Sequence, residues 1–377
     1  MDMLTLGSKL TTYRTNLRFS LKEVAKLSKL PVSTINDYET GKIQKPDFNK
    51  IEQLCKIYGV SLSILIASVE PVSTIHFRLS NFSLTENEEQ RIEDLLTFID
   101  DYENILELLG DQEDIYLHRT YPNNPSLNWF ELGHRIAISE RKYWGYIITQ
   151  PVDLLPSIQN EGILVNFIEL PESIDGFFYM SANSKTFWIF VNANKPGARK
   201  NFTLAHEYAH FLLDRDQKNY VCNINRPGSD PLESRANAVA ARILVPRPAL
   251  EDRVPKKVTP DKVIELCHVF GVSSDVINYR LIDEGFVSKR KGQELLQYDY
   301  NSNHLYRVHM DSINKKFDLP KLDLSFRSLN PVQEEFLVKV TKAYGDGKIT
   351  FARALSYFRN EKMAEQLGVF PKKPEDL

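Results

Sequence analysis

The sequence predicts a multidomain fold, with an all-α head, an α+β middle domain built on a small sheet, and a mostly helical C-terminal region. Three observations support this prediction. The chain has 377 residues, which exceeds one typical domain. Short segments of helical periodicity fill residues 4–68. Short β-branched and aromatic runs, separated by Gly, Pro, Asn and Ser, cluster within residues 150–195 and give way to helical patterns.

The composition is that of an ordinary globular protein, with 42% hydrophobic and 26% charged residues. No run of 18 or more apolar residues predicts a membrane span, and the N-terminus lacks the pattern of a secretory signal. Cys55, Cys222 and Cys267 lie far apart, which argues against a disulfide framework and a CxxC metal site. We therefore expect a cytoplasmic protein with no membrane partner.

Charge is distributed unevenly along the chain. Residues 1–68 hold 10 Lys and Arg against 6 Asp and Glu, whereas the whole chain has a net charge of −3. Residues 85–114 hold 12 acidic residues and a single basic one, Arg91. A mildly basic head on an acidic body is compatible with nucleic-acid contact at the head alone.

Residues 1–70 are predicted to form the helical head. Ser20-Leu-Lys-Glu23 has the form of a capping box and opens a short helix. Lys29-Leu-Pro31 interrupts that helix, and a second one runs through Ile35 before Gly41. Two short helices joined by a tight turn, with helices on either side, are the plan of a helix-turn-helix domain.

Residues 71–125 are predicted to be a linker followed by one acidic amphipathic helix over 86–110, whose acidic face is interpreted as a solvated surface. Residues 126–290 are predicted to form the α+β domain. Its strands are expected at 162–165, 176–179 and 187–191, and its main helices at about 202–214, 232–244 and 260–285. Residues 291–377 are predicted to be mostly helical, although 288–328 show little periodicity.

The stretch His206-Glu207-Tyr-Ala-His210 has the pattern H-E-x-x-H. On a helix, residues i and i+4 share a face, so both imidazoles can reach one Zn²⁺ ion per chain. Glu207 is the expected catalytic base, because its carboxylate can take a proton from a water molecule and pass it to a leaving amine. This constellation predicts a zincin-like metallopeptidase domain, although a bare H-E-x-x-H also occurs by chance in helices.

Catalytic zinc sites use three protein ligands, and the third must come from elsewhere in the chain. Glu233 is the best candidate, because it begins the next predicted helix. The alternative interpretation is an acid that stabilises that helix N-terminus. Asn237 lies on the same helix face and could hydrogen-bond a ligand histidine, and Asp214, four residues after His210, is a second candidate for this supporting role.

Around these residues the chain resembles the ImmA/IrrE family of metallopeptidases. The resemblance covers roughly residues 150–285. It rests on three stretches: Phe187-Trp-Ile-Phe-Val-Asn192, Arg199-Lys-Asn-Phe-Thr-Leu-Ala-His-Glu-Tyr-Ala-His210 and Glu233-Ser-Arg-Ala-Asn-Ala-Val-Ala-Ala-Arg-Ile-Leu-Val-Pro246. It implies that His206, His210 and Glu233 bind zinc and that Glu207 is the base.

Residues 4–68 are similar to the Xre/Cro-type helix-turn-helix. The resemblance places these residues on the recognition helix or near DNA phosphates: Val32, Ser33, Asn36 and Asp37 on the helix, and Lys42 and Lys45 near phosphates. The recognition helix carries no Arg, Lys or Gln, and Leu21 stands where the family often has Gln. DNA binding through residues 1–70 is the prediction, and the alternative is a helical module that docks onto another protein.

Family resemblance implies that such a peptidase cuts a repressor-type protein and thereby controls transcription, often under stress. One alternative is a transcriptional regulator whose peptidase-like domain senses a ligand or partner without proteolysis. Another is a component of a toxin–antitoxin or phage-defence pair. A homodimer is a further expectation, because helix-turn-helix readers often act as dimers.

Overall fold

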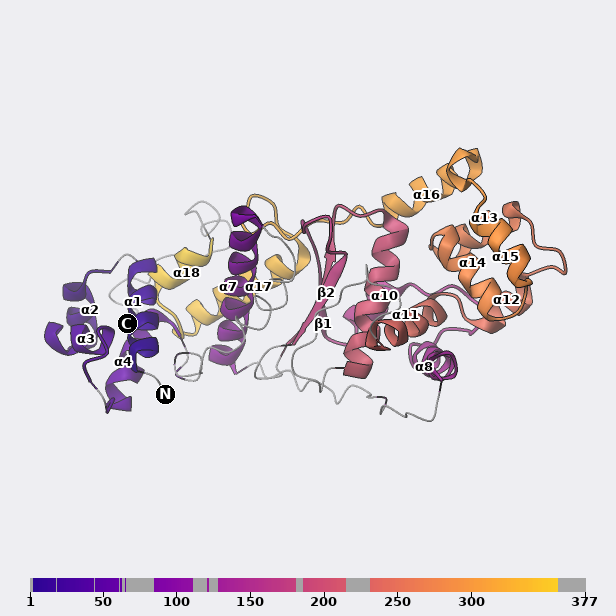
Figure 1. Ribbon diagram of the computed structural model, residues 1–377. Coiled ribbons are helices and arrows are strands. Elements are labelled where there is room, and N and C mark those ends of the chain that lie inside the picture. Colours follow the sequence, from indigo (N-terminus) through magenta and orange to yellow (C-terminus); the bar gives the residue numbers. More distant parts are fainter. Residues whose placement is uncertain are drawn as a thin grey trace. The chain divides into compact units, whose positions relative to one another are not determined.

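The computed structural model describes residues 3–17, 19–43, 45–60, 62, 65, 85–110, 121, 128–180, 186–214 and 231–358 (Figure 1). These residues form two compact units. The first unit contains the described residues of 1–77, 85–114 and 322–377. The second unit contains the described residues of 115–321. No helix in the described part of the chain is long and apolar enough to cross a membrane.

Four helices form the head within the first unit: α1 (Met3–Asn16), α2 (Leu21–Ser28), α3 (Val32–Glu39) and α4 (Phe48–Tyr58). The Ser20 hydroxyl and the Glu23 carboxylate make the predicted capping box at the start of α2. Lys29 ends that helix in the left-handed region, with φ of 56°, and turns the chain into α3. The two helices therefore adopt the predicted helix-turn-helix arrangement.

A buried core and one bidentate ion pair hold the head together. Leu10, Ile35 and Leu54 come from three different helices, and each has no exposed side-chain surface. Arg14 Nε lies 2.7 Å from Glu39 Oε1, and Arg14 Nη2 lies 2.8 Å from Glu39 Oε2. This two-point contact joins α1 to the end of α3 and fixes the orientation of the helix that is expected to meet DNA.

The rest of the first unit is formed by α7 (Glu86–Leu109), α17 (Pro331–Gly345) and α18 (Phe351–Phe358). The predicted acidic helix is present, and Thr85 and Glu88 cap its first turn. Its apolar face contacts α17, where the Phe98 and Phe336 rings meet edge to face at 5.4 Å between centroids. The acidic helix thus packs against a segment more than 200 residues further along the chain.

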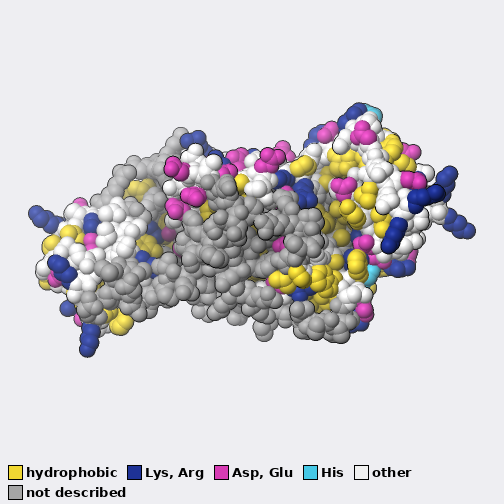
Figure 2. Space-filling model, viewed as in Figure 1, with side chains coloured by type: hydrophobic (Ala, Val, Ile, Leu, Met, Phe, Trp, Pro, Cys, Tyr) yellow, Lys and Arg dark blue, Asp and Glu magenta, His cyan; other side chains and the backbone are white. Residues whose placement is uncertain are grey.

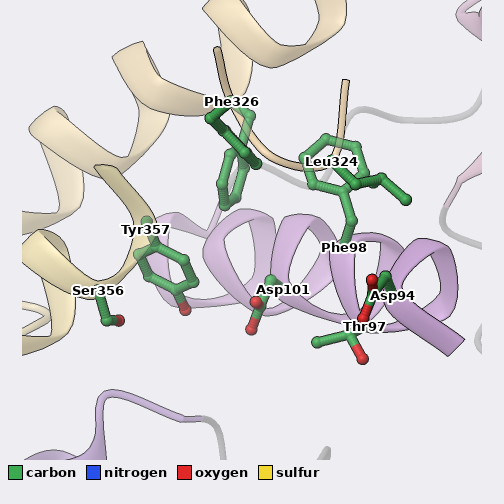
Figure 3. A pocket seen from close by; sticks show the side chains of 9 residues that line it. Asp94, Thr97, Phe98, Asp101, Leu324, Phe326, Ser356 and Tyr357 are labelled. Carbon is green, nitrogen blue, oxygen red and sulfur yellow. The ribbon is translucent and has the colours of Figure 1, made fainter. Parts of the chain in front are cut away.

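A pocket lies between α7, α17, α18 and the segment that precedes α17 (Figure 3). Phe326, on that segment, has φ of 56° and places its ring 6.1 Å from the ring of Phe98. The Asp323 carboxylate holds this conformation by accepting hydrogen bonds from the backbone N–H groups of Ser325, Arg327 and Ser328. The loop is therefore an ordered part of the first unit.

The second unit is built on a three-stranded sheet with the order β1 (Ile163–Ile168), β3 (Phe187–Asn192), β2 (Gly176–Met180). The central strand β3 pairs parallel to β1 and antiparallel to β2. All six residues of β3 are buried, as expected for a strand with neighbours on both sides. Helix α10 (Gly197–Asp214) packs against β2 and β3, which places the H-E-x-x-H helix on the sheet.

Helix α10 begins at Gly197, earlier than the predicted start near residue 202. The Gly197 N–H donates a hydrogen bond of 2.7 Å to Asn314 Oδ1, and the Lys200 ammonium donates one of 3.2 Å to the Phe317 carbonyl. Both partners lie on or just after α16 (His304–Lys316), so the first turn of α10 depends on residues more than 110 positions away. Local sequence patterns carry no sign of this contact.

The remaining helices surround the sheet and α10. They are α8 (Trp129–Tyr143), α9 (Leu154–Gln159), α11 (Pro231–Leu244), α12 (Arg247–Arg253), α13 (Pro260–Phe270), α14 (Ser274–Asp283), α15 (Lys289–Leu296) and the short 3₁₀ helix Tyr300–Ser302. The stretch 288–328, which showed little periodicity, contains α15, the 3₁₀ helix and α16. Helix α11 packs closely against both α8 and α10.

We expect Gly197→Ala to lower the thermal stability of the second unit. An added Cβ would lie 2.6 Å from the carbonyl oxygen of Ile313, and a backbone atom cannot yield as a flexible side chain can. Overpacking of this kind costs about 1–3 kcal/mol. Thermal unfolding followed by circular dichroism measures the effect. Gly345→Ala is the control, because no atom lies within 4 Å of its added Cβ, and equal melting temperatures for the two variants would contradict the prediction.

Candidate metal centre

Two neighbouring helices bring three candidate ligands together. His206 and His210 lie one turn apart on α10, and Glu233 lies in the first turn of α11. The two Nε2 atoms are 3.1 Å apart, and His206 Nε2 lies 3.2 Å from Glu233 Oε2. His210 Nε2 lies 3.9 Å from Glu233 Oε1. The structure therefore places the three predicted ligands around one point. The two helices that carry them, α10 and α11, are labelled in Figure 1.

The other ring nitrogen of each histidine contacts a different side chain. His206 Nδ1 lies 3.0 Å from Asn237 Oδ1, and His210 Nδ1 lies 2.7 Å from Asp214 Oδ2. The second Asp214 oxygen pairs with the guanidinium of Arg235. Oxygen acceptors at both Nδ1 atoms favour the tautomer with the proton on Nδ1, so both Nε2 lone pairs point at the shared space.

This donor set fits a zinc ion. Two ligand atoms at about 2.0–2.1 Å from zinc, with tetrahedral angles between them, lie about 3.4 Å apart. The three ligand groups of His206, His210 and Glu233 have candidate atoms within 4.8 Å of one another. Two imidazole nitrogens and one carboxylate are also the ligand types of a catalytic zinc site, which keeps one position open.

The centre is deeply buried. His206, His210 and Asp214 have no exposed surface, and Glu233 is 4% exposed. Burial by itself lowers the pKa of His206, but its hydrogen bond to Glu233 and the nearby negative charges raise the pKa above its ordinary value overall. Burial also lowers the pKa of His210, and there the hydrogen bond to Asp214 does not offset it.

Glu207, the predicted base, is also fully buried and follows His206 directly on α10. Its charge is close enough to act on the His206 imidazole. The next residue, Tyr208, donates a hydrogen bond of 2.6 Å to Glu140 Oε2 on α8. Tyr208 is thus part of the packing between α10 and α8, and its hydroxyl proton is held by that carboxylate.

The predicted DNA-contacting residues lie on or just after α3. Val32 and Ser33 are exposed in its first turn, and Asn36 and Asp37 are partly exposed one turn later. Lys42 and Lys45, which follow the helix, are both exposed. Lys42 Nζ lies 3.8 Å from Asp37 Oδ1, an ion pair that the sequence did not reveal.

Two further residues of the centre were not identified from the sequence. Arg235 neutralises the buried Asp214, and Glu140 accepts hydrogen bonds from both Tyr121 and Tyr208. The sequence offered one indication of the role of Arg235: this basic residue lies between Glu233 and Asn237, two residues that were already candidates for the site. For Glu140 it offered none, since its partners lie 19 and 68 residues away.

Comparison with known families agrees with this architecture. Residues 158–282 match the model of the IrrE N-terminal-like domain, and residues 5–63 match that of a helix-turn-helix domain. No curated protein matches the chain. The two matches define the class of protein: a DNA-binding regulator with a peptidase-like domain. They confirm that this chain fuses a helix-turn-helix head to an IrrE-like domain.

We expect Asn237→Ala to weaken zinc binding by about 10- to 100-fold, because His206 would lose the acceptor that orients its ring. Asn237→Asp keeps an oxygen at the same place and should retain most of the affinity. Competition with a chromogenic chelator measures the dissociation constant. Ser234→Ala, on the same helix, controls for general effects on α11. Equal affinities for Asn237→Ala and Ser234→Ala would contradict this role.

Proposed function

We propose that this chain is a regulatory zinc-dependent metallo-endopeptidase with a DNA-binding head, which controls transcription by cleaving a repressor-type protein. One observation carries the proposal. His206, His210 and Glu233 converge at ligand distances, with both imidazoles oriented by Asn237 and Asp214 and with Glu207 next in sequence to a ligand. A purely structural cluster would not need the two Nε2 atoms to face each other at 3.1 Å.

The proposed chemistry is hydrolysis of a peptide bond. Zinc, when bound by His206, His210 and Glu233, would polarise the scissile carbonyl and lower the pKa of water. The Glu207 carboxylate accepts the proton of the attacking water and delivers it to the leaving amine. Because Glu207 lies in a buried environment, its charge acts with little screening by solvent.

The arrangement of the chain supports a repressor-type substrate. A head that binds operator DNA would raise the local concentration of the peptidase around a repressor bound to the same DNA. A homodimer would extend this binding to two half-sites related by two-fold symmetry. The operator would then select the substrate by proximity, in addition to any recognition at the peptidase site.

Glu207→Gln tests the proposed proteolysis. The amide keeps the size of the side chain but cannot accept the proton, so cleavage should fall by about 100- to 10,000-fold while zinc binding persists. Mass spectrometry of new protein N-termini, in cells that express the wild type or the variant, measures cleavage. Metal analysis of both purified proteins checks that about one zinc per chain remains.

His206→Ala is the companion variant, because it removes a ligand and should lose both zinc and cleavage. If regulation of transcription continues unchanged in Glu207→Gln, proteolysis is not the physiological role and the peptidase-like domain acts as a sensor. If the cleaved protein is a toxin or antitoxin, the chain is a component of such a pair.

A further inference from the structure

Helix α3 has one buried face and one open face. Ile35 and Tyr38 point into the core of the head and are 0% and 1% exposed. The open face carries two pairs of residues at i, i+4 spacing: Val32 with Asn36, and Ser33 with Asp37. The fold of the head, held by the Arg14–Glu39 pair, therefore leaves this face of α3 and its four side chains accessible to a DNA groove.

The chemistry of this face limits which bases it can read. Guanine is read in the major groove mainly by Arg or Lys, which donate to its O6 and N7. The open face of α3 has neither. The Asn36 amide can donate to N7 and accept from the N6 amino group of adenine, and the Val32 methyl groups, 40% exposed, can contact the C5-methyl of thymine.

Asp37 adds a restriction of its own. A carboxylate in the major groove accepts a hydrogen bond from the N4 amino group of cytosine, and it is repelled by phosphates. Lys42 lies 3.8 Å away and offsets part of that repulsion. With side-chain exposures of 68% for Lys42 and 40% for Asp37, both groups remain accessible to DNA.

Positive charge lies around α3 and not on it. Exposed lysines are found on α2 and after α3, at positions that include Lys22, Lys26, Lys42 and Lys45. Figure 2 shows Lys and Arg side chains projecting from the head, with hydrophobic side chains between them. This division suits contact with phosphates by the surroundings and apolar or amide contact with bases by α3.

We propose that α3 reads a guanine-free half-site strand: adenine at Asn36, a thymine methyl group at Val32, and the cytosine amino group at Asp37. This inference rests on the DNA binding proposed above and goes beyond it, because it names the class of sequence. The discrimination comes from a missing cation as much as from the contacts that are present, because guanine at these positions finds no Arg or Lys on α3 to donate to both its O6 and its N7.

Selection from a pool of duplexes with a randomised central region tests the inference. The full-length chain is incubated with the pool at low salt, and the retained duplexes are sequenced. Wild type should enrich a motif with an A·T pair whose replacement by G·C weakens binding about fivefold to a hundredfold. Asn36→Ala should abolish the preference at that pair, because alanine offers neither the donor nor the acceptor that reads adenine.

Two controls separate the possible outcomes. Asn49→Ala removes an exposed asparagine from α4 and should leave the motif intact. Asp37→Asn should tighten binding to all duplexes and relax the cytosine preference. One outcome that overturns the base assignment is an enriched motif that contains a guanine preference, if Asn36→Ala or Asp37→Asn abolishes that preference. Binding without any sequence preference overturns it as well. If no duplex is retained at all, DNA binding itself fails and the inference fails with it.

Discussion

The contact between α10 and α11 is the constraint on which the candidate centre depends. It holds two sets of polar contacts: Arg235 with Asp214 and His210, and His206 with the half-buried Asn237. A buried charge is costly unless it is paired, so the buried Asp214 carboxylate requires the Arg235 guanidinium. The same requirement fixes the relative position of the two helices and points the imidazole Nε2 atoms and Glu233 at one space.

The sheet and the surrounding helices give this contact a rigid base. Fully buried β3 supports α10 from one side, and the first turn of α10 donates hydrogen bonds to α16 and to the residue after it. Helix α8 contributes Glu140, whose carboxylate binds the Tyr208 hydroxyl two residues before His210. The candidate ligands are therefore held by packing on several sides, as the precise geometry of a metal site requires.

In the head, the residues that stabilise the fold are separate from those proposed to contact a partner. Its core and the Arg14–Glu39 pair fix the backbone of α3, while the open face of that helix contributes no side chain to this core. In our proposals, a few exposed side chains would carry the specificity of the head, whereas buried side chains would carry that of the candidate metal centre. The two parts can respond to different partners within one chain.

Features that depend on local periodicity and spacing could be predicted from the amino-acid sequence alone. The capping box at Ser20, the acidic helix α7, the strands of the sheet and the i, i+4 histidines all follow from patterns within a few residues. The resemblance of two segments to known families was also readable from the sequence, and the matches over 5–63 and 158–282 confirm it.

Contacts between distant segments could not be predicted in this way and are seen only in the folded chain. The early start of α10 at Gly197 requires Asn314, and the pairing of α7 with α17 joins residues more than 200 positions apart. The distance of 3.2 Å between Glu233 Oε2 and His206 Nε2 also depends on a contact between separate segments. The sequence suggested Glu233 as a ligand, but the packing of the two helices sets this distance. Burial of side chains from separate segments in one core determines such contacts, and no local pattern encodes that shared burial.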